Sequence, residues 1–351
     1  MKYFLKWLYI VAILVGITMP SASYATNGMF LIGYGTKSRG AGGVAIAMPQ
    51  DAIAGGVNPA TISFVKSRVD AGMDIFLPRA ESELGVPAGG RLKVKSRADT
   101  FAMPAMGGLY NFNRKVTMGF SGIPYGGGGS RYNTNLYNAA TGANSEKTLG
   151  VNLMLMQMNP TIAYKVNKQN SVGASIVFGV QTFRAFGLDY FENFTATGLG
   201  STGLTNKGND WAYGAGVRLG WMGQFMKKRL SLGAAYSSRV YMTEFDEYDE
   251  LFAEQGDLDT PANVGVGIAY KFTPKLTSGM DVTHTFYEDV ASIGNDSAQL
   301  PGGSIFPDGE TKTCKPLLSW RIFPCEQQNR HTLRNVGAQR AKGPGSVHYS
   351  R

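Results

Sequence analysis

Long runs of strict two-residue alternation constrain the fold of this chain more than any other feature of its sequence. In the stretch 211–221, large apolar side chains occupy every second position, and small or charged side chains lie between them. Successive side chains of a β-strand point to opposite faces, so such a run predicts an amphipathic strand. About nine segments share the pattern: 67–78, 97–112, 114–124, 149–166, 169–186, 209–224, 229–243, 260–272 and 274–288.

The lengths of these segments and of their connections favour a membrane barrel over a secreted β-sandwich, which is the alternative. Several segments exceed the ~5–6 residues of a typical soluble strand and reach the ~9–11 that a tilted membrane strand needs. Short turns at 111–114, 167–170 and 272–275 alternate with long loops at 125–148, 187–208 and 244–259. This alternation is typical of outer-membrane barrels. We therefore predict an all-β protein, an antiparallel transmembrane β-barrel.

Composition agrees with this prediction and excludes other classes. The chain has 46 Gly among 351 residues and only 17% charged residues, and glycine can form the small face of an amphipathic strand. After residue 25 no run approaches the ~20 apolar residues that a spanning helix needs. The net charge of +9 does not indicate nucleic-acid binding, because residues 301–351 alone hold 8 Lys/Arg against 3 Asp/Glu.

The two ends of the chain differ from the alternating part. Residues 1–25 have two early lysines, an apolar centre and a small-residue site ending at Ala25, which predicts a cleaved secretory signal peptide; an uncleaved anchor is the alternative. Residues 296–351 lose the alternation and contain both cysteines, Cys314 and Cys325. We expect this atypical tail to come from a frameshift or truncation that removed the last strands. A genuine appended segment is the alternative.

Residues 26–66 form a third kind of segment, rich in glycine and without long alternation. Its motifs are NGMF at 27–30, GYGTK at 33–37, QDA at 50–52 and NPA at 58–60, and later in the chain come LFAEQG at 251–256, TPAN at 260–263 and DVASIG at 289–294. In this order, over about residues 26–295, the motifs resemble the FadL-type outer-membrane transporters of long-chain fatty acids and aromatic hydrocarbons. The Gly35–Gly40 and Gly127–Gly129 runs lack the context of a phosphate-binding loop and are interpreted as turns.

The resemblance implies fourteen strands, and we expect the last of them to be missing here. It also implies that residues 26–66 form a hatch and that this hatch lies inside the lumen of a barrel formed by residues 67–295. It implies loop capture of the ligand, rearrangement of the hatch at Asn58, Pro59 and Ala60, and lateral exit through the wall. It also places Met29 and Phe30, at the start of the hatch, next to the ligand.

The residues themselves suggest where a hydrophobic ligand could bind. If Met154, Met156 and Met158 face lipid, the interleaved side chains face the lumen, where they contact either the ligand or the hatch; these are Val151, Leu153 and Leu155. Two loops concentrate apolar side chains, and we expect either an exposed capture groove, with a short amphipathic helix in 244–259, or a lid packed on the barrel. The loop residues are Phe191, Phe194, Phe245, Tyr248, Leu251 and Phe252.

Charged side chains on the inner face are secondary candidates. Arg68, Arg218, Arg239 or Lys271 could bind a carboxylate ligand, but pairing with acidic residues of the wall is the simpler expectation; the acidic candidates are Asp70, Asp74 and Asp281.

Catalysis is not expected. His284 lacks an orienting partner, and no metal-binding motif is present, so we predict neither an enzyme nor a cofactor nor a metal site. We predict a monomeric outer-membrane channel for passive uptake of fatty acids or aromatic hydrocarbons. Its other contacts would be with outer-membrane lipid, lipopolysaccharide and the barrel assembly machinery, and none with nucleic acid. Alternatives are a structural or adhesive barrel whose loops bind partners, and an outer-membrane lipid enzyme that depends on His284.

Overall fold

The computed structural model describes residues 28–85, 91–141, 146–189, 203–274, 276–294 and 317–318. The signal peptide predicted at 1–25, the loop residues Phe191 and Phe194, and all but two residues of the 296–351 tail lie outside the described residues. In this part of the chain, no helix combines the length and the apolar character needed to span a membrane.

Most of the described strands form one large antiparallel sheet, in which the long strands pair with one another in the order in which they follow along the chain. Its long strands are β1 (Arg68–Phe76), β4 (Phe101–Asn111), β5 (Val116–Tyr132), β6 (Leu149–Lys165), β7 (Asn170–Phe186), β8 (Asp210–Phe225), β9 (Leu230–Ser237), β11 (Asn263–Thr273) and β12 (Leu276–Thr285). The short β10 (Tyr241–Met242) pairs with β8, and β13 (Leu317–Leu318) pairs with β12. The sheet thus has eleven described strands, and the fourteen of the resemblance stay a prediction.

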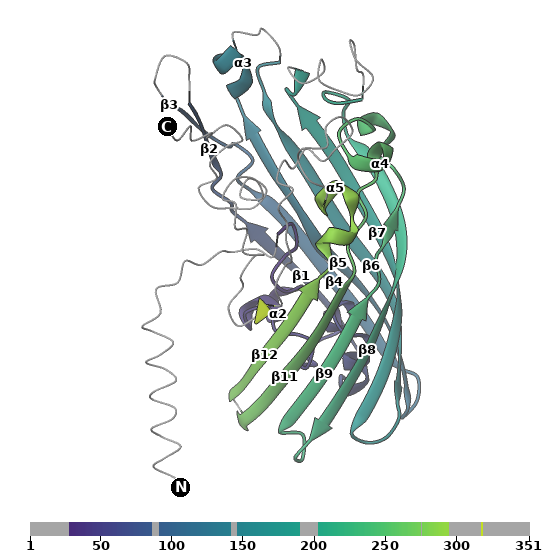
Figure 1. Cartoon of the computed structure of the whole chain (residues 1–351). Coiled ribbons are helices and arrows are strands. Elements are labelled where there is room, and N and C mark those ends of the chain that lie inside the picture. The colour runs from purple at the N-terminus through teal and green to yellow at the C-terminus, as the bar shows by residue number, and fades with distance from the viewer. Residues whose placement is uncertain are drawn as a thin grey trace.

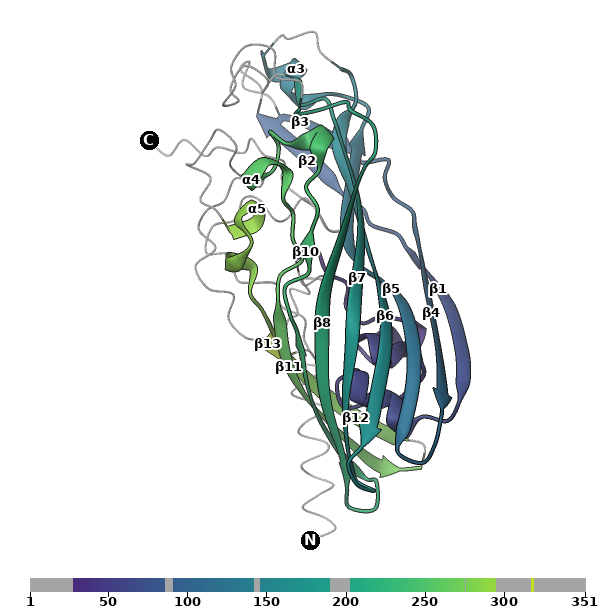
Figure 2. The same ribbon diagram turned by 90° about the vertical axis from the view of Figure 1, so that its right-hand side faces the viewer.

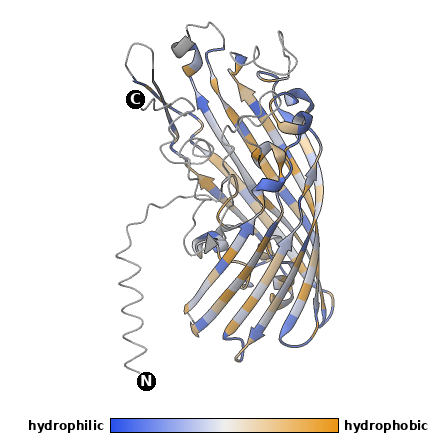
Figure 3. Cartoon of the chain, viewed as in Figure 1, coloured by the Kyte–Doolittle hydropathy of each residue, from blue (hydrophilic) through white to orange (hydrophobic). Residues whose placement is uncertain are grey.

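The two-residue alternation predicted the faces of the sheet correctly. On β7 and β8 most large apolar side chains are exposed on the convex face, and the residues between them are buried or half-buried on the concave face, where they include the large apolar Val177, Phe183 and Met222. Met154 and Met158 of β6 are 43% and 41% exposed, whereas Leu153 and Leu155 are buried. Figure 3 shows the resulting apolar bands along the strands. A sheet with this outer face fits a lipid environment.

Turn lengths also follow the prediction, with two corrections. The connections β4–β5, β6–β7, β8–β9 and β11–β12 are short, and long loops lie at the other end of the sheet (Figures 1 and 2). The segment 125–148 is not entirely loop, because β5 continues to Tyr132; Gly127–Gly129 are therefore strand residues that pair with β6 after an irregularity at Pro124/Gly126. The alternation also missed the two-stranded hairpin of β2 (Glu81–Gly85) and β3 (Arg91–Lys95), whose strands are short.

Short helices occupy the remaining described segments. Residues 28–66 contain α2 (Thr36–Gly40), η1 (Ile53–Gly56) and η2 (Pro59–Phe64) and lie against the concave side of the curled sheet, in purple in Figures 1 and 2. The loop helices are α3 (Leu136–Thr141), η4 (Asp246–Tyr248), α4 (Ala253–Gly256), η5 (Tyr287–Asp289) and α5 (Ala291–Gly294).

Candidate functional site

The hatch segment approaches the sheet closely because glycines line the wall beneath it. η1 and η2 contact β5, β6, β7 and β8. A Cβ added at Gly173 would lie 2.6 Å from the backbone of Pro59 and Ala60, and one at Gly107 would lie 2.8 Å from the backbone of Ala52 and Ile53. Only a residue without a side chain permits such contact between two backbones.

Asn58 connects two parts of the hatch to the wall. Its side chain is fully buried, and Nδ2 donates to the carbonyl of Ile46 at 2.7 Å and to the carbonyl of Trp221 in β8 at 3.0 Å. The backbone N–H of Ala60 donates to Oδ1 at 3.0 Å, and Pro59 occupies the first turn of η2, where its missing N–H is not needed. The bonds to Ile46 and Ala60 stay within residues 28–66, whereas the bond to β8 joins this segment to the wall and is a result of the tertiary fold.

Asp281 of β12 provides a second connection between hatch and wall. Its carboxylate Oδ2 accepts hydrogen bonds from the backbone N–H groups of Ala45 and Ile46, at 2.8 and 2.9 Å. The sequence led us to expect a basic partner for Asp281, whereas the structure shows these backbone donors of the hatch. Charge-assisted bonds of this kind are among the stronger hydrogen bonds in proteins.

Arg218 of β8 is a buried cation on the inner face, with only 3% of its surface exposed. Its guanidinium donates to the carbonyl of Gly56 in η1, and also to Asn159 Oδ1, Gln157 Oε1 and Ser237 Oγ at 3.2, 2.9 and 3.4 Å. Within the described residues these acceptors are all neutral. The expectation that Arg218 pairs with an acidic wall residue is therefore wrong, because amide and hydroxyl groups surround it instead.

The other basic candidates either form ion pairs with acidic side chains or are exposed. Arg68 forms a two-point ion pair with Asp70, as expected, and Lys271 is exposed. Arg239 pairs with Asp257 and Asp259 of the loop rather than with a wall residue.

One apolar cluster brings together the described residues that the sequence proposed for ligand binding. We call it the loop–hatch cluster; its buried members among those residues are Phe30, Leu153, Leu155, Phe245, Tyr248, Leu251 and Phe252, and Met29 and Val151 pack against it. It also contains residues that sequence reasoning missed, namely Ile53, Ile123, Tyr125, Phe183, Tyr287, Val290 and Ile293. Inward positions on alternating strands could have indicated Ile123 and Phe183, but nothing in the sequence indicated that Ile123 lies beside Gly56 of the hatch or that Phe183 packs against the aromatic residues of 244–259.

The loop side of this cluster is a packed aromatic group around Phe183 of β7. The ring centroid of Phe183 lies 4.7 Å from that of Phe252, 5.0 Å from Tyr248 and 5.8 Å from Phe245. Tyr248 is also fixed by its hydroxyl, which donates to the carbonyl of Gly208 at 2.7 Å. Such tilted and edge-to-face contacts stabilise aromatic clusters beyond simple burial.

Residues 244–259, which we call the lid segment, are therefore packed on the wall. The prediction of an exposed apolar groove here is wrong for this state, and the alternative of a packed lid describes it. The predicted amphipathic helix is also wrong: the segment has only the short η4 and α4, and Glu254 and Gln255 adopt left-handed φ angles of 53° and 62°. Those two residues interrupt the helical path that the aromatic spacing suggested.

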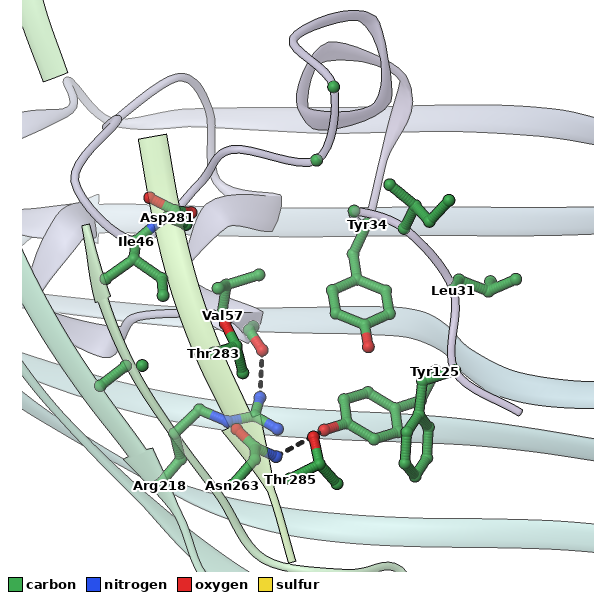
Figure 4. A pocket seen from close by; sticks show the side chains of 18 residues that line it. Leu31, Tyr34, Ile46, Val57, Tyr125, Arg218, Asn263, Asp281, Thr283 and Thr285 are labelled. Carbon is green, nitrogen blue, oxygen red and sulfur yellow. Dashed lines mark hydrogen bonds between the residues drawn. The ribbon is translucent and has the colours of Figure 1, made fainter. Parts of the chain in front are cut away.

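A cavity of about 130 Å³ with several polar side chains in its lining, which we call the polar cavity, lies between the hatch and strands β5, β8, β9, β11 and β12. Tyr34 of the hatch stacks on Tyr125 of β5, with centroids 5.1 Å apart and ring planes 12° apart, and Phe30 lies 5.0 Å from Tyr125. Asn263 donates to the Tyr125 hydroxyl at 2.9 Å. Figure 4 shows the rings of Tyr34 and Tyr125 together with Arg218, Thr283 and Thr285, which also line the cavity.

Among the titratable groups outside the spanning strands, Asp257 and Tyr34 have shifted pKa values that bear on the site. Burial, the nearby Asp259 carboxylate and a hydrogen bond to it raise the pKa of Asp257 to about 7, although Arg239 opposes the shift. Removal from bulk water raises the pKa of Tyr34 well above its ordinary value, so its hydroxyl stays protonated.

Metal and acid–base chemistry find little support in the described residues. Among these, no group of three or more His, Cys, Asp or Glu side chains could hold a metal ion. His284 is half-buried, and its ring lies 4.6 Å from that of Phe286 in an edge-to-face contact.

A curled antiparallel sheet with an apolar outer face and a segment packed in its concave side defines the class of outer-membrane transport barrels. The chain belongs to the family described as outer membrane protein transport protein (OMPP1/FadL/TodX), whose model matches residues 21–305. This family consists of transport proteins rather than enzymes. It carries hydrophobic compounds across the outer membrane.

Solved structures show the same fold. The Ralstonia pickettii toluene transporter TbuX is 20% identical, with 76% of this chain and 74% of that chain covered and a TM-score of 0.55. The Pseudomonas putida toluene transporter TodX is 17% identical, with coverages of 76% and 73% and a TM-score of 0.56. A Pseudomonas aeruginosa FadL homologue is 17% identical, with coverages of 75% and 70% and a TM-score of 0.50. No curated protein sequence matches the chain.

Proposed function

We propose that the protein is a passive channel that takes up long-chain fatty acids or aromatic hydrocarbons, with the lid segment as the entry and the hatch as the exit. The observation that carries the proposal is the loop–hatch cluster. It joins apolar side chains of the lid segment, the inner wall and the hatch in one continuous group. A hydrocarbon passing along it would leave water without covering unpaired polar groups, which is the main cost of apolar transport through a protein.

Entry requires the lid segment to separate from Phe183. In the packed state Phe245 and Phe252 are completely buried, so a ligand must replace their contacts as it enters. A hydrocarbon or acyl chain can do so because apolar contacts are not directional. Leu153 and Leu155 of the wall would then receive the ligand and pass it toward Met29 and Phe30 of the hatch.

Exit requires a change in the hatch, for which we propose residues 26–66, against a wall of residues 67–295. Polar connections hold the hatch to the wall at several points, among them Asn58, Asp281, the carbonyl of Gly56 bonded by Arg218, and Ala52 bonded to Asp70. A segment held by discrete connections of this kind can change position when they break together. Release of the segment around Asn58, Pro59 and Ala60 would open the route to a lateral exit in the wall.

Uptake by whole cells tests the proposal. Cells that carry the protein in the outer membrane should accumulate labelled oleate or labelled toluene faster than cells without it. Phe252→Ser should lower the rate, because it places a hydroxyl in the loop–hatch cluster. Phe112→Ser is the matched control, since Phe112 is 65% exposed in a short turn at the other end of the sheet.

The outcomes separate the candidate functions. Equal uptake of both compounds with and without the protein, at confirmed outer-membrane levels, would refute the channel and leave a surface barrel with partner-binding loops. A loss of uptake in Phe112→Ser equal to that in Phe252→Ser would show that the cluster is not the route.

A further inference from the structure

The polar cavity adjoins the loop–hatch cluster, which supplies its aromatic residues, but the rest of its lining differs from the cluster in chemistry. One side is aromatic and consists of Phe30, Tyr34 and Tyr125. The other side carries polar side chains from three strands, namely Arg218, Asn263, Asp281, Thr283 and Thr285. A site for plain hydrocarbon would not need this second side.

The size of the cavity fits one small ring. Its free volume is about 130 Å³, and it is partly open to its surroundings. A protein cavity of about 150 Å³ with an apolar lining accommodates benzene, so the free volume here is of the order that a single ring needs. The stacked Tyr34 and Tyr125 and the adjacent Phe30 offer faces and edges on which such a ring can pack.

The polar side requires a hydrogen-bonding group on that ring. The hydroxyls of Thr283 and Thr285 line the cavity, and neither is hydrogen-bonded to any of the described residues. A hydrocarbon ring would take these hydroxyls out of water without replacing their hydrogen bonds, which is unfavourable for each buried hydroxyl. A ring with a hydroxyl substituent can satisfy one of them, both as donor and as acceptor.

The charges around the cavity favour a neutral ligand over a carboxylate. Arg218 and Asp281 carry opposite charges and both line it. A guanidinium has five N–H donors, and the structure gives Arg218 four acceptors already, so its paired donors are not free to hold a carboxylate from two sides. An added negative charge would also face Asp281.

We propose that this cavity is a binding site for a neutral, single-ring aromatic alcohol of the phenol type, in preference to the corresponding hydrocarbon. The ring lies against Tyr34, Tyr125 and Phe30, and its hydroxyl bonds Thr283 or Thr285. The inference rests on the proposed function, because the ligand reaches the cavity only through the loop–hatch cluster.

The matched ligands p-cresol and toluene test the inference, since they differ by one hydroxyl. Binding of each, and of p-hydroxybenzoate as the charged analogue, is measured by calorimetry with the purified full chain in detergent. We expect p-cresol to bind about tenfold more tightly than toluene, equivalent to one hydrogen bond to an otherwise unsatisfied hydroxyl. Equal or tighter binding of toluene, or tighter binding of p-hydroxybenzoate, would overturn it.

Variants locate the site. Thr285→Val and Thr283→Val keep the shape of the side chain and remove its hydroxyl, so together they should abolish the preference for p-cresol and leave toluene binding unchanged or stronger. Thr277→Val, at an exposed position of the same strand, is the control and should keep the preference. If the double variant keeps the preference, the hydroxyl binds elsewhere and the proposal is wrong.

The experiments distinguish failure of the channel proposal from failure of the polar-cavity proposal. Uptake of oleate or toluene by cells, without preferential binding of p-cresol, removes only the polar-cavity inference. Absence of both uptake and binding removes the channel as well.

Discussion

Replacement of Asn58 by alanine should release the hatch from the wall. The side chain of Asn58 donates to the carbonyls of Ile46 and Trp221 and accepts from the N–H of Ala60, all in a fully buried environment. Asn58→Ala leaves three backbone groups without this partner. Because Trp221 belongs to β8 while the others belong to the hatch, the lost bonds include a direct connection between hatch and wall.

The size of the effect follows from the number of groups affected. At about 1 kcal/mol for each group, near the lower end of the cost of an unsatisfied buried partner, the total is about 3 kcal/mol. Since ~1.4 kcal/mol corresponds to a factor of ten in an equilibrium constant, the released hatch should become roughly 100-fold more populated relative to the docked hatch. N58D should have a similar effect, because a carboxylate still accepts from Ala60 but cannot donate to the two carbonyls.

Leakage of large antibiotics and dyes into cells measures the released state. We expect both Asn58 variants to raise leakage, and deletion of residues 26–60 to raise it further. Asn113→Ala is the matched control, because Asn113 also accepts backbone hydrogen bonds, at 2.7 and 2.8 Å, but does so in an exposed turn. Leakage no greater in Asn58→Ala than in Asn113→Ala, at equal amounts of protein in the membrane, would refute the reasoning.

Two further predictions concern the wall and the lid segment. Gly173→Ala should push Ala60 off the wall and raise leakage, since the new Cβ would lie 2.6 Å from its backbone nitrogen; Gly108→Ala, whose Cβ would meet only Val69 at 3.8 Å, should not. Asp257 has a pKa of about 7 in the folded loop against an ordinary 3.8, so its contribution to loop stability is complete below pH 4 and lost as the pH rises through 7. The protection factors of residues 244–259 in hydrogen exchange, which correct for the intrinsic rise of the exchange rate with pH, should therefore fall above pH 7 in the wild type and much less in Asp257→Asn; identical pH profiles of the protection factors would contradict this.

The sequence by itself determined the strands and their faces. Alternation along β7 and β8 depends only on the two-residue period of a strand, and its apolar face predicted the outer face of the sheet. In β6, which is apolar on both faces, the period separated Leu153 and Leu155 from Met154, and the structure decided that the leucines point inward. Periodicity failed at the ends of elements. β5 continues past Pro124 because a register irregularity lets its glycines pair with β6, which no local rule indicated.

The tertiary structure alone decided how the inner face is used. In the sequence, Arg218 occupies an ordinary inward position of an alternating strand. Its hydrogen-bond acceptors nevertheless come from β6, β9 and the hatch, and all of them in the described residues are neutral. The lid aromatics have helical spacing, yet they are buried against Phe183 without forming a regular helix, because long-range packing outweighs local propensity. The polar cavity brings Tyr34 and Thr285 together from opposite ends of the described chain. Period and composition fix which face of a strand is apolar; contacts between residues far apart in the sequence depend on the three-dimensional fold, and the candidate binding sites consist of such contacts.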